Sequence, residues 1–220
     1  MRNLKKFLAL VLAMMMVMSL MLTVNAASSS YPDADKINQT YAEAVEVLSA
    51  LGVLKGDADG FRPTNTITRA EMAAVLYRIY TGRVGDAGKA YADMFKADSV
   101  FDDVTSELDW AQGYINYAYI QQLVKGDTGN TRYRPGDPVT GYEVLAMLLR
   151  AIGYTRSGEF EGVQFIPNVT YYASELGIID NITGALSNYA TRQQVAEMAF
   201  RAMNVTQVSI INAVSASDKM

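Results

Sequence analysis

The stretch Ile67–Glu71, with the sequence ITRAE, decides the fold because it starts a helix and recurs twice in the chain. Residues 139–143 read VTGYE, and residues 190–194 read ATRQQ. In each copy a threonine precedes a glutamate or glutamine by three residues, which is the pattern of a capping box at a helix start. The predicted capping pairs are Thr68 with Glu71, Thr140 with Glu143, and Thr191 with Gln194.

Other motifs recur in the same order before this stretch. The sequence LKGD at 54–57 returns as VKGD at 124–127, and FRP at 61–63 returns as YRP at 133–135. A third copy, recognisable from LGII at 176–179, lacks the aromatic-Arg-Pro element. Ordered matches of this kind indicate an internal repeat.

Each copy is predicted to form a helix, a loop and a second helix. Apolar residues return every three or four positions, as one face of an α-helix requires, while Gly, Asp, Pro and Asn fill the loops. The second helix of the first copy is expected to run from Arg69 to just before Gly82. The stretches 83–99 and 155–164 are interpreted as polar or glycine-containing connectors. The other predicted helical segments are 41–51, 110–118, 144–152, 169–176 and 195–202.

A single pair of short helices buries too little apolar surface to be stable alone. The three copies are therefore predicted to share one core, with their second helices packed together. No strand-like alternation of any length occurs between the helical segments. The predicted fold class is all-α.

The first 26 residues have the composition of a secretory signal peptide. A start with three basic residues precedes an apolar run over 7–24, and small residues at Val24 and Ala26 suit cleavage. The alternative is a retained membrane helix, since about 18 apolar residues are just enough to span a bilayer. The polar serines at 28–30 favour cleavage. The chain is thus predicted to be secreted, with no stable membrane span after cleavage.

The composition excludes several classes of protein. The chain has no cysteine and no histidine, which excludes disulfides, zinc–thiolate sites and histidine-based catalytic triads. Its formal net charge of −4 argues against nonspecific nucleic-acid binding, which needs clustered basic residues. The sequence DADG at 57–60 resembles a calcium loop, but Phe61 and Thr68 stand where an oxygen ligand and a glutamate are required. No metal and no cofactor are predicted.

Two arginines in the repeated stretch are not explained by helix capping. Arg69 and Arg192 occupy the first helical position, where a cation is disfavoured by the positive end of the helix dipole. A bound anion would explain them, because the arginine and free backbone N–H groups would then point at the same ligand. The alternative is a solvent-exposed arginine without a ligand. The second copy has Gly141 at this position, so a site there would be weaker or absent.

The combined motifs resemble those of the S-layer homology domain. Repeats of that family open with an aromatic-x-Asp motif, continue with an L-G-[IV]-x-x-G turn and a [FY]-x-P loop, and start their second helix with ITRAE. The openings here are YPD at 31–33, FDDV at 101–104 and a degenerate FIPNV at 165–169. The resemblance divides the chain into a signal peptide (1–26), repeats at 31–82, 100–154 and, degenerate, 162–204, and a short tail (205–220).

The resemblance implies a pseudo-threefold, three-pronged helical domain with grooves between its repeats. Such grooves bind secondary cell-wall polysaccharide, often pyruvylated, and hold exported proteins noncovalently on the bacterial surface. The family's groove arginine corresponds to Arg69 and Arg192, and weaker correspondences are Trp110, Tyr133 and Arg134. From the residues alone, Trp110 could instead be a core residue, and Arg134 could only brace its loop.

Two other functions remain open at this stage. Degenerate repeats could have lost glycan binding, leaving a structural surface protein that binds other surface proteins or serves a further domain. The other is an enzyme that acts on wall glycans through two carboxylates. Acidic residues do crowd 102–109, but they lie in one short segment, and the repeats leave no room for a catalytic module. The sequence therefore predicts a protein that is not an enzyme.

Overall fold

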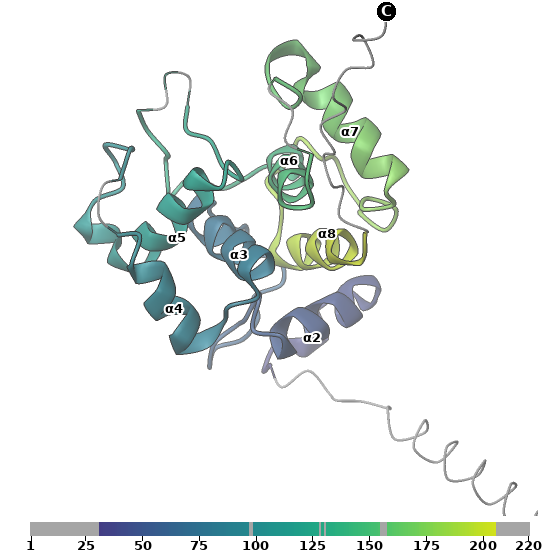
Figure 1. Cartoon of the computed structure of the whole chain (residues 1–220). Helices are drawn as coiled ribbons and strands as arrows, with labels where there is room; N and C mark the ends of the chain where they lie inside the picture. The colour runs from purple at the N-terminus through teal and green to yellow at the C-terminus, as the bar shows by residue number, and fades with distance from the viewer. Residues whose placement is uncertain (1–30, 97–98, 128, 130, 155–157, 206–220) are drawn as a thin grey trace, which may run out of the picture.

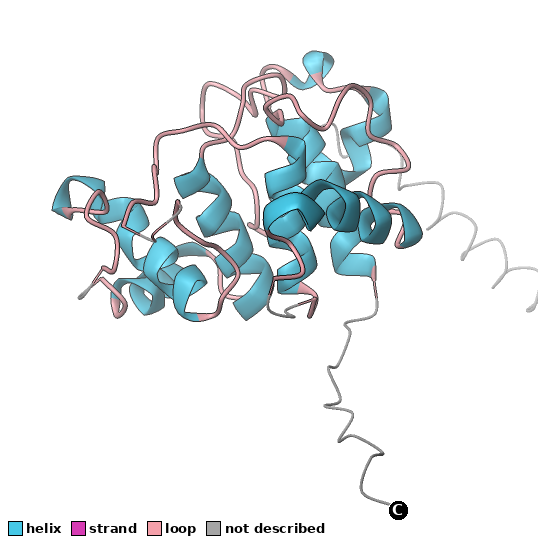
Figure 2. Ribbon diagram, turned by 90° about the horizontal axis from the view of Figure 1, so that it is seen from above, coloured by secondary structure: helices cyan, strands magenta, loops and turns pink. Residues whose placement is uncertain are grey.

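A computed structural model of the chain describes residues 31–96, 99–127, 129, 131–154 and 158–205. The predicted signal peptide and nearly all of the tail lie outside these residues. Over the described part the protein is helical, with isolated β-bridges and no strand, which confirms the all-α prediction (Figure 2). The same part contains no helix with the length and apolar character that a bilayer crossing needs. Its α-helices are α2 (Ala42–Ala50), α3 (Arg69–Thr81), α4 (Gly85–Asp93), α5 (Asp109–Ile120), α6 (Gly141–Ala151), α7 (Phe165–Glu175) and α8 (Arg192–Asn204).

The helices α3, α6 and α8 start where the capping pattern places them. Thr68 and Glu71 form a reciprocal capping box at α3, and Thr140 with Glu143 forms another at α6. At α8, Gln194 Oε1 accepts the backbone N–H of Thr191 at 2.9 Å. The recurring Thr-x-x-Glu/Gln pattern is therefore confirmed as the signal that begins the second helix of each copy.

These second helices form the centre of the fold. Helix α6 contacts both α3 and α8, and all three contribute fully buried side chains to one core (Figure 1). The first helix of each copy packs against a second helix from another copy: α5 on α3, α7 on α6, and α2 on α8. The first helix of a copy therefore packs mainly against a helix of another copy, so the copies do not form separate helix pairs.

A closed ring of backbone hydrogen bonds joins the three loops just before these helices. Ile67 N–H donates to the carbonyl of Ala190, Ala190 N–H to that of Val139, and Val139 N–H to that of Ile67. The donor–acceptor distances are 3.3, 2.8 and 3.1 Å. Each of the three residues immediately precedes a helix-starting threonine, so these hydrogen bonds join the three loops at equivalent positions.

The interpretation of 83–99 as a connector is wrong, because this stretch contains α4. Its short apolar face, including Ala92, packs against the tyrosines of α3 and α5. Contact is close at Gly113 of α5, where an added Cβ would lie 2.1 Å from the Ala92 carbonyl oxygen. The aromatic rings of Tyr77, Tyr117 and Phe95 pack edge to face in this region. Glycines at 85 and 88 and few apolar residues hid the helix from the sequence pattern.

Candidate functional site: two grooves between the copies

Arg69 reaches from the start of α3 into the loop of the second copy. Its Nε donates to the Tyr133 carbonyl at 2.6 Å, and Nη2 donates to the Lys125 carbonyl at 2.8 Å. The guanidinium lies 4.7 Å from the centre of the Tyr133 ring, and Nη1 lies 3.3 Å from Glu143 Oε1. The residue is only 5% exposed, so it is a buried cation held by carbonyls, a ring and a carboxylate.

Arg192 repeats this arrangement from α8 into the loop of the first copy. It donates to the carbonyls of Phe61 at 2.8 Å and Lys55 at 2.7 Å, and it lies 5.2 Å from the Phe61 ring centre. Its Nη1 is 3.7 Å from Glu71 Oε1. Burial lowers the pKa of Arg192, and the Glu71 carboxylate opposes that shift. Both capping glutamates therefore have a second role, because each also faces the arginine of another copy.

The expectation that free N–H groups accompany these arginines is wrong. Arg69 N–H donates to the Asp137 carbonyl, and Ala70 N–H donates to the Pro135 carbonyl. The first N–H groups of α8 are bound in the same way by carbonyls of the first copy's loop. The helix starts have no spare donors there, so an anion would have to be bound by side chains. The alternative that these arginines are solvent-exposed is wrong as well, since both are buried.

The corresponding interface at α6 lacks the arginine and its partners together. An added Cβ on Gly141 would lie 2.9 Å from the Leu186 carbonyl oxygen, so the loop of the third copy closes against the helix start. Seven residues before the helix-starting threonine, this loop has Gly184 where the other copies have Phe61 or Tyr133. The capping residue of α8 is also the neutral Gln194 rather than glutamate.

Two aspartates hold the loops on which the arginines rest. Arg134 has a left-handed backbone, with φ of 58°, and Arg62 has φ of 55°. Asp103 accepts the N–H groups of Tyr133 and Arg134, each at 2.8 Å, and Asp33 does the same for Phe61 and Arg62. Burial raises the pKa of each aspartate, but the two N–H donors outweigh it and hold the pKa below its ordinary value.

Replacing Asp103 by asparagine is expected to lower the free energy of unfolding by about 1–3 kcal/mol at neutral pH. Because the folded-state pKa is lowered, the stabilisation is complete above the ordinary pKa of about 3.8 and is lost as the pH falls through the folded-state value. The stabilities of the parent and the variant should therefore converge on acidification.

Urea denaturation from neutral pH to about pH 3 measures this convergence across the ordinary aspartate pKa. The Asp102→Asn substitution, at an exposed neighbour, is the matched control. Equal losses of stability in the two variants at neutral pH would contradict the role assigned to Asp103.

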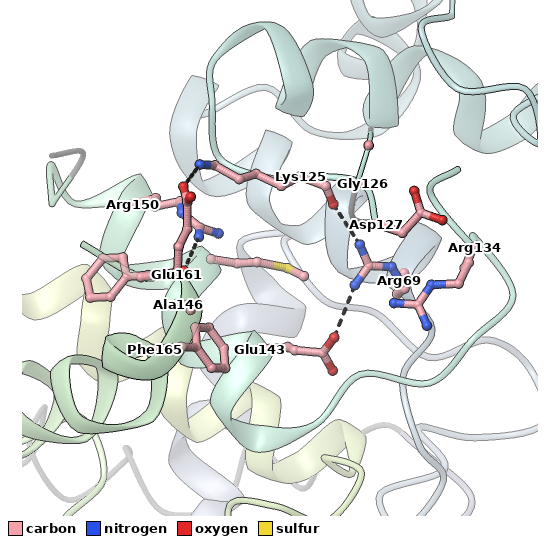
Figure 3. A pocket seen from close by; sticks show the side chains of 14 residues that line it. Arg69, Lys125, Gly126, Asp127, Arg134, Glu143, Ala146, Arg150, Glu161 and Phe165 are labelled. Atoms are coloured by element: carbon pink, nitrogen blue, oxygen red, sulfur yellow. Dashed lines mark hydrogen bonds and ion pairs between the residues drawn. The ribbon is translucent and has the colours of Figure 1, made fainter. Parts of the chain in front are cut away.

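The two buried arginines each border a groove. The Arg69 groove has a volume of about 620 Å³ and is lined by Arg69, Lys125, Arg134, Glu143, Arg150, Glu161 and Phe165, among others (Figure 3). The Arg192 groove has a volume of about 390 Å³, and its lining includes Arg192, Lys55, Glu71, Arg78, Lys89 and Trp110. Each groove thus combines an arginine from one copy, a lysine and a second arginine from another, and an aromatic ring.

The predicted ligand-binding residues divide between the grooves. Arg69 and Arg134 lie in one groove, while Arg192 and Trp110 lie in the other. Trp110 is 45% exposed, so its interpretation as a core residue is wrong. Tyr133 is fully buried and supports Arg69 from beneath, which leaves it without a surface to offer a ligand. Arg134 also braces its loop, with Nη1 lying 3.5 Å from Asp137.

Sequence reasoning missed several residues that line the grooves. Lys55 and Lys125 belong to the repeated KGD motif, which by itself indicates only the repeat. Their recurrence at matching positions was the available signal. Arg78 and Arg150 each lie seven residues after a capping glutamate, on the helix face that borders the groove. Phe165 belongs to the degenerate opening motif, which by itself does not indicate a residue that lines a groove.

Comparison with known proteins places these features in a family context. Residues 30–73 and 100–145 match the model of the S-layer homology domain. A cell surface protein of Thermoanaerobacter kivui is 30% identical, over 96% of this chain and 26% of that protein. The middle cell wall protein of Brevibacillus brevis is 32% identical, over 82% of this chain and 16% of that protein.

A surface layer protein of Brevibacillus choshinensis is 31% identical, over 81% of this chain and 15% of that protein. This chain therefore spans about a quarter or less of the length of these three relatives. The three alignments, over 214, 182 and 180 residues, are longer than the two segments that match the family model.

Proposed function

We propose that this chain, in which residues 30–73 and 100–145 match the S-layer homology domain, attaches noncovalently to the bacterial cell wall by binding secondary cell-wall polysaccharide. The observation that carries the proposal is the pair of equivalent grooves, each lined by at least two arginines, one lysine and one aromatic ring. We assign one polysaccharide segment to each groove. The predicted signal peptide agrees with export to the cell surface.

The side chains in the grooves suit an anionic sugar such as one bearing a pyruvate ketal. The carboxylate would meet Lys55 in the Arg192 groove or Lys125 in the Arg69 groove, with the buried arginine adding positive potential behind it. Trp110 is half-exposed and can stack on a sugar ring. Because the chain has a net negative charge, attraction to an anionic polymer has to be local rather than global.

The third copy has a different role in this proposal. Its loop has Gly184 where the other two loops have Phe61 or Tyr133, and the helix start it faces has glycine instead of arginine. Its helix α8 nevertheless provides Arg192 to the groove of the first copy. We therefore propose that the third copy completes the ring of backbone hydrogen bonds and the Arg192 groove. It does not form a third binding site of the same kind.

Co-sedimentation with purified cell-wall sacculi tests the proposal. The protein is expected to pellet with sacculi that retain their attached polysaccharide and to stay in the supernatant when the polymer has been removed chemically. The Trp110→Ala substitution should weaken pelleting, because it removes the exposed ring of one groove while leaving the core intact.

The Tyr171→Ala variant is the matched control, because Tyr171 is also an exposed aromatic residue on a helix but does not line either groove. Absence of pelleting with either kind of sacculus would overturn the proposal. Equal pelleting with both kinds would assign the ligand to peptidoglycan itself instead of the attached polymer.

A further inference from the structure

The two grooves differ in how their lysines are engaged. In the Arg69 groove, Lys125 Nζ forms an ion pair with Glu161, which lies in the connector before α7 (Figure 3). In the Arg192 groove, no carboxylate within the described part of the chain forms an ion pair with Lys55. Lys89, the other lysine of that groove, pairs with Asp93 on its own helix. One groove therefore contains a carboxylate of its own at the lysine, and the other does not.

Glu161 also lies near the second cation of its groove. Arg150 Nη2 donates to the carbonyl of Phe160, the residue before Glu161, at 3.3 Å. Burial lowers the pKa of Arg150, and the Glu161 carboxylate opposes that shift. Lys125 and, more weakly, Arg150 also lower the pKa of Glu161, so the carboxylate is ionised at neutral pH. The connector thus places a negative charge between the two cations on this side of the groove.

An ion pair of this kind competes directly with an anionic ligand. Lys125 and Glu161 are each about half exposed, with side-chain exposures of 46% and 48%, so a ligand can reach both. A ligand carboxylate that takes the place of Glu161 must first break the existing pair. Exposed ion pairs contribute about 0.2–1 kcal/mol, which corresponds to a loss of up to about fivefold in affinity.

We propose that Glu161 is a built-in competitor that weakens anion binding in the Arg69 groove, so that the Arg192 groove fills first. This inference rests on the proposed function, since it concerns the same two grooves. The difference in affinity between the two grooves would then depend on one residue, Glu161. The polysaccharide would then attach through the Arg192 groove and engage the Arg69 groove at higher ligand concentration.

Tryptophan fluorescence can report on each groove in turn. Trp110 is the only tryptophan of the sequence and lines the Arg192 groove. Phe165 lines the Arg69 groove in the corresponding place, at the start of the next copy's first helix. A double variant, Trp110→Phe with Phe165→Trp, moves the reporter from one groove to the other. Calorimetric titration of the parent protein checks independently whether two classes of site exist.

The probe is a simple hexopyranoside carrying one pyruvate ketal. In the background with the moved reporter, Glu161→Gln is expected to tighten probe binding about two- to fivefold, because Lys125 is released. The control is Asp127→Asn, which removes the same charge from the same groove but no ion pair with Lys125. Asp127 Oδ1 instead accepts the Arg132 N–H at 3.2 Å. The control should tighten binding by less than Glu161→Gln does.

The outcomes separate this inference from the proposed function. Equal effects of Glu161→Gln and Asp127→Asn, or no tightening at all, would overturn the competitor role while leaving binding in the grooves intact. Tighter binding in the parent's Arg69 groove than in its Arg192 groove would also overturn it. If the probe binds to neither groove of any variant while polymer-bearing sacculi still pellet the protein, the competitor role is overturned, because no sugar carboxylate binds where Glu161 would compete, and the wall attachment stands.

Discussion

Replacing Arg69 by alanine is expected to lower the free energy of unfolding by about 3–5 kcal/mol. The substitution leaves the carbonyls of Lys125 and Tyr133 without their arginine donors and removes the ion-pair partner of Glu143. It also leaves a void above the Tyr133 ring at the interface between two copies. The loss is large because the arginine is buried and all these groups were arranged around it.

Urea denaturation followed by circular dichroism measures this loss. The Arg62→Ala variant is the control, because Arg62 makes an ion pair with Asp57 at 2.6 Å but is 40% exposed. Exposed pairs of this kind contribute about 0–1 kcal/mol. If the two substitutions lower the free energy of unfolding equally, the buried contacts of Arg69 do not stabilise the interface between the copies as proposed. A wall-binding assay on the Arg69 variant is informative only at temperatures where it remains folded.

Introducing arginine at Gly141 is expected to destabilise the protein by about 2–4 kcal/mol, although the other two copies have arginine there. Even a Cβ would lie 2.9 Å from the Leu186 carbonyl oxygen, so the loop of the third copy must move. The new guanidinium would find neither an aromatic ring, since Gly184 replaces it, nor a carboxylate, since Gln194 is neutral. The result would be a crowded cation without the partners that stabilise Arg69 and Arg192.

Gly136→Arg is the matched control for this experiment. Nothing lies within 4 Å of a Cβ added to Gly136, so the same change in size and charge costs about 0.5 kcal/mol or less there. A Gly141→Arg variant as stable as the parent would show that the arginine needs no matched ring and glutamate. Adding Gly184→Phe and Gln194→Glu to Gly141→Arg is not expected to recover the loss, because Gly184 has a φ of 88°, at which a phenylalanine backbone is strained.

The local features of the fold could be predicted from the sequence. Capping pairs such as Thr68 with Glu71 act within a few residues, so their pattern is visible without knowledge of the fold. The helix from Arg69 to just before Gly82 agrees with α3 for the same reason. Helix α4 was missed because it is stabilised by the aromatic side chains of α3 and α5 rather than by its own periodicity.

The environment of the arginines could not be predicted, because it is built by another copy. The sequence places Arg69 next to free N–H groups when the helix is considered alone. In the structure, carbonyls of Pro135 and Asp137 take those groups, and Tyr133 lies under the guanidinium. No local pattern states which loop faces which helix start. Gly141, Gly184 and Gln194 replace the arginine, the aromatic ring and the glutamate of one interface. That these three replacements belong to the same interface is visible only when the loop that faces each helix start is known.

The ring formed by Ile67, Val139 and Ala190 has a consequence for the order in which the protein can fold. Its three members lie far apart in the chain, so two of the three hydrogen bonds must wait until the last member has been synthesised. Contacts between distant segments are slow to form because the intervening chain must first be brought together. The hydrogen-bonded centre of the fold can therefore be completed only after the chain has been synthesised through Ala190, however early its individual helices appear.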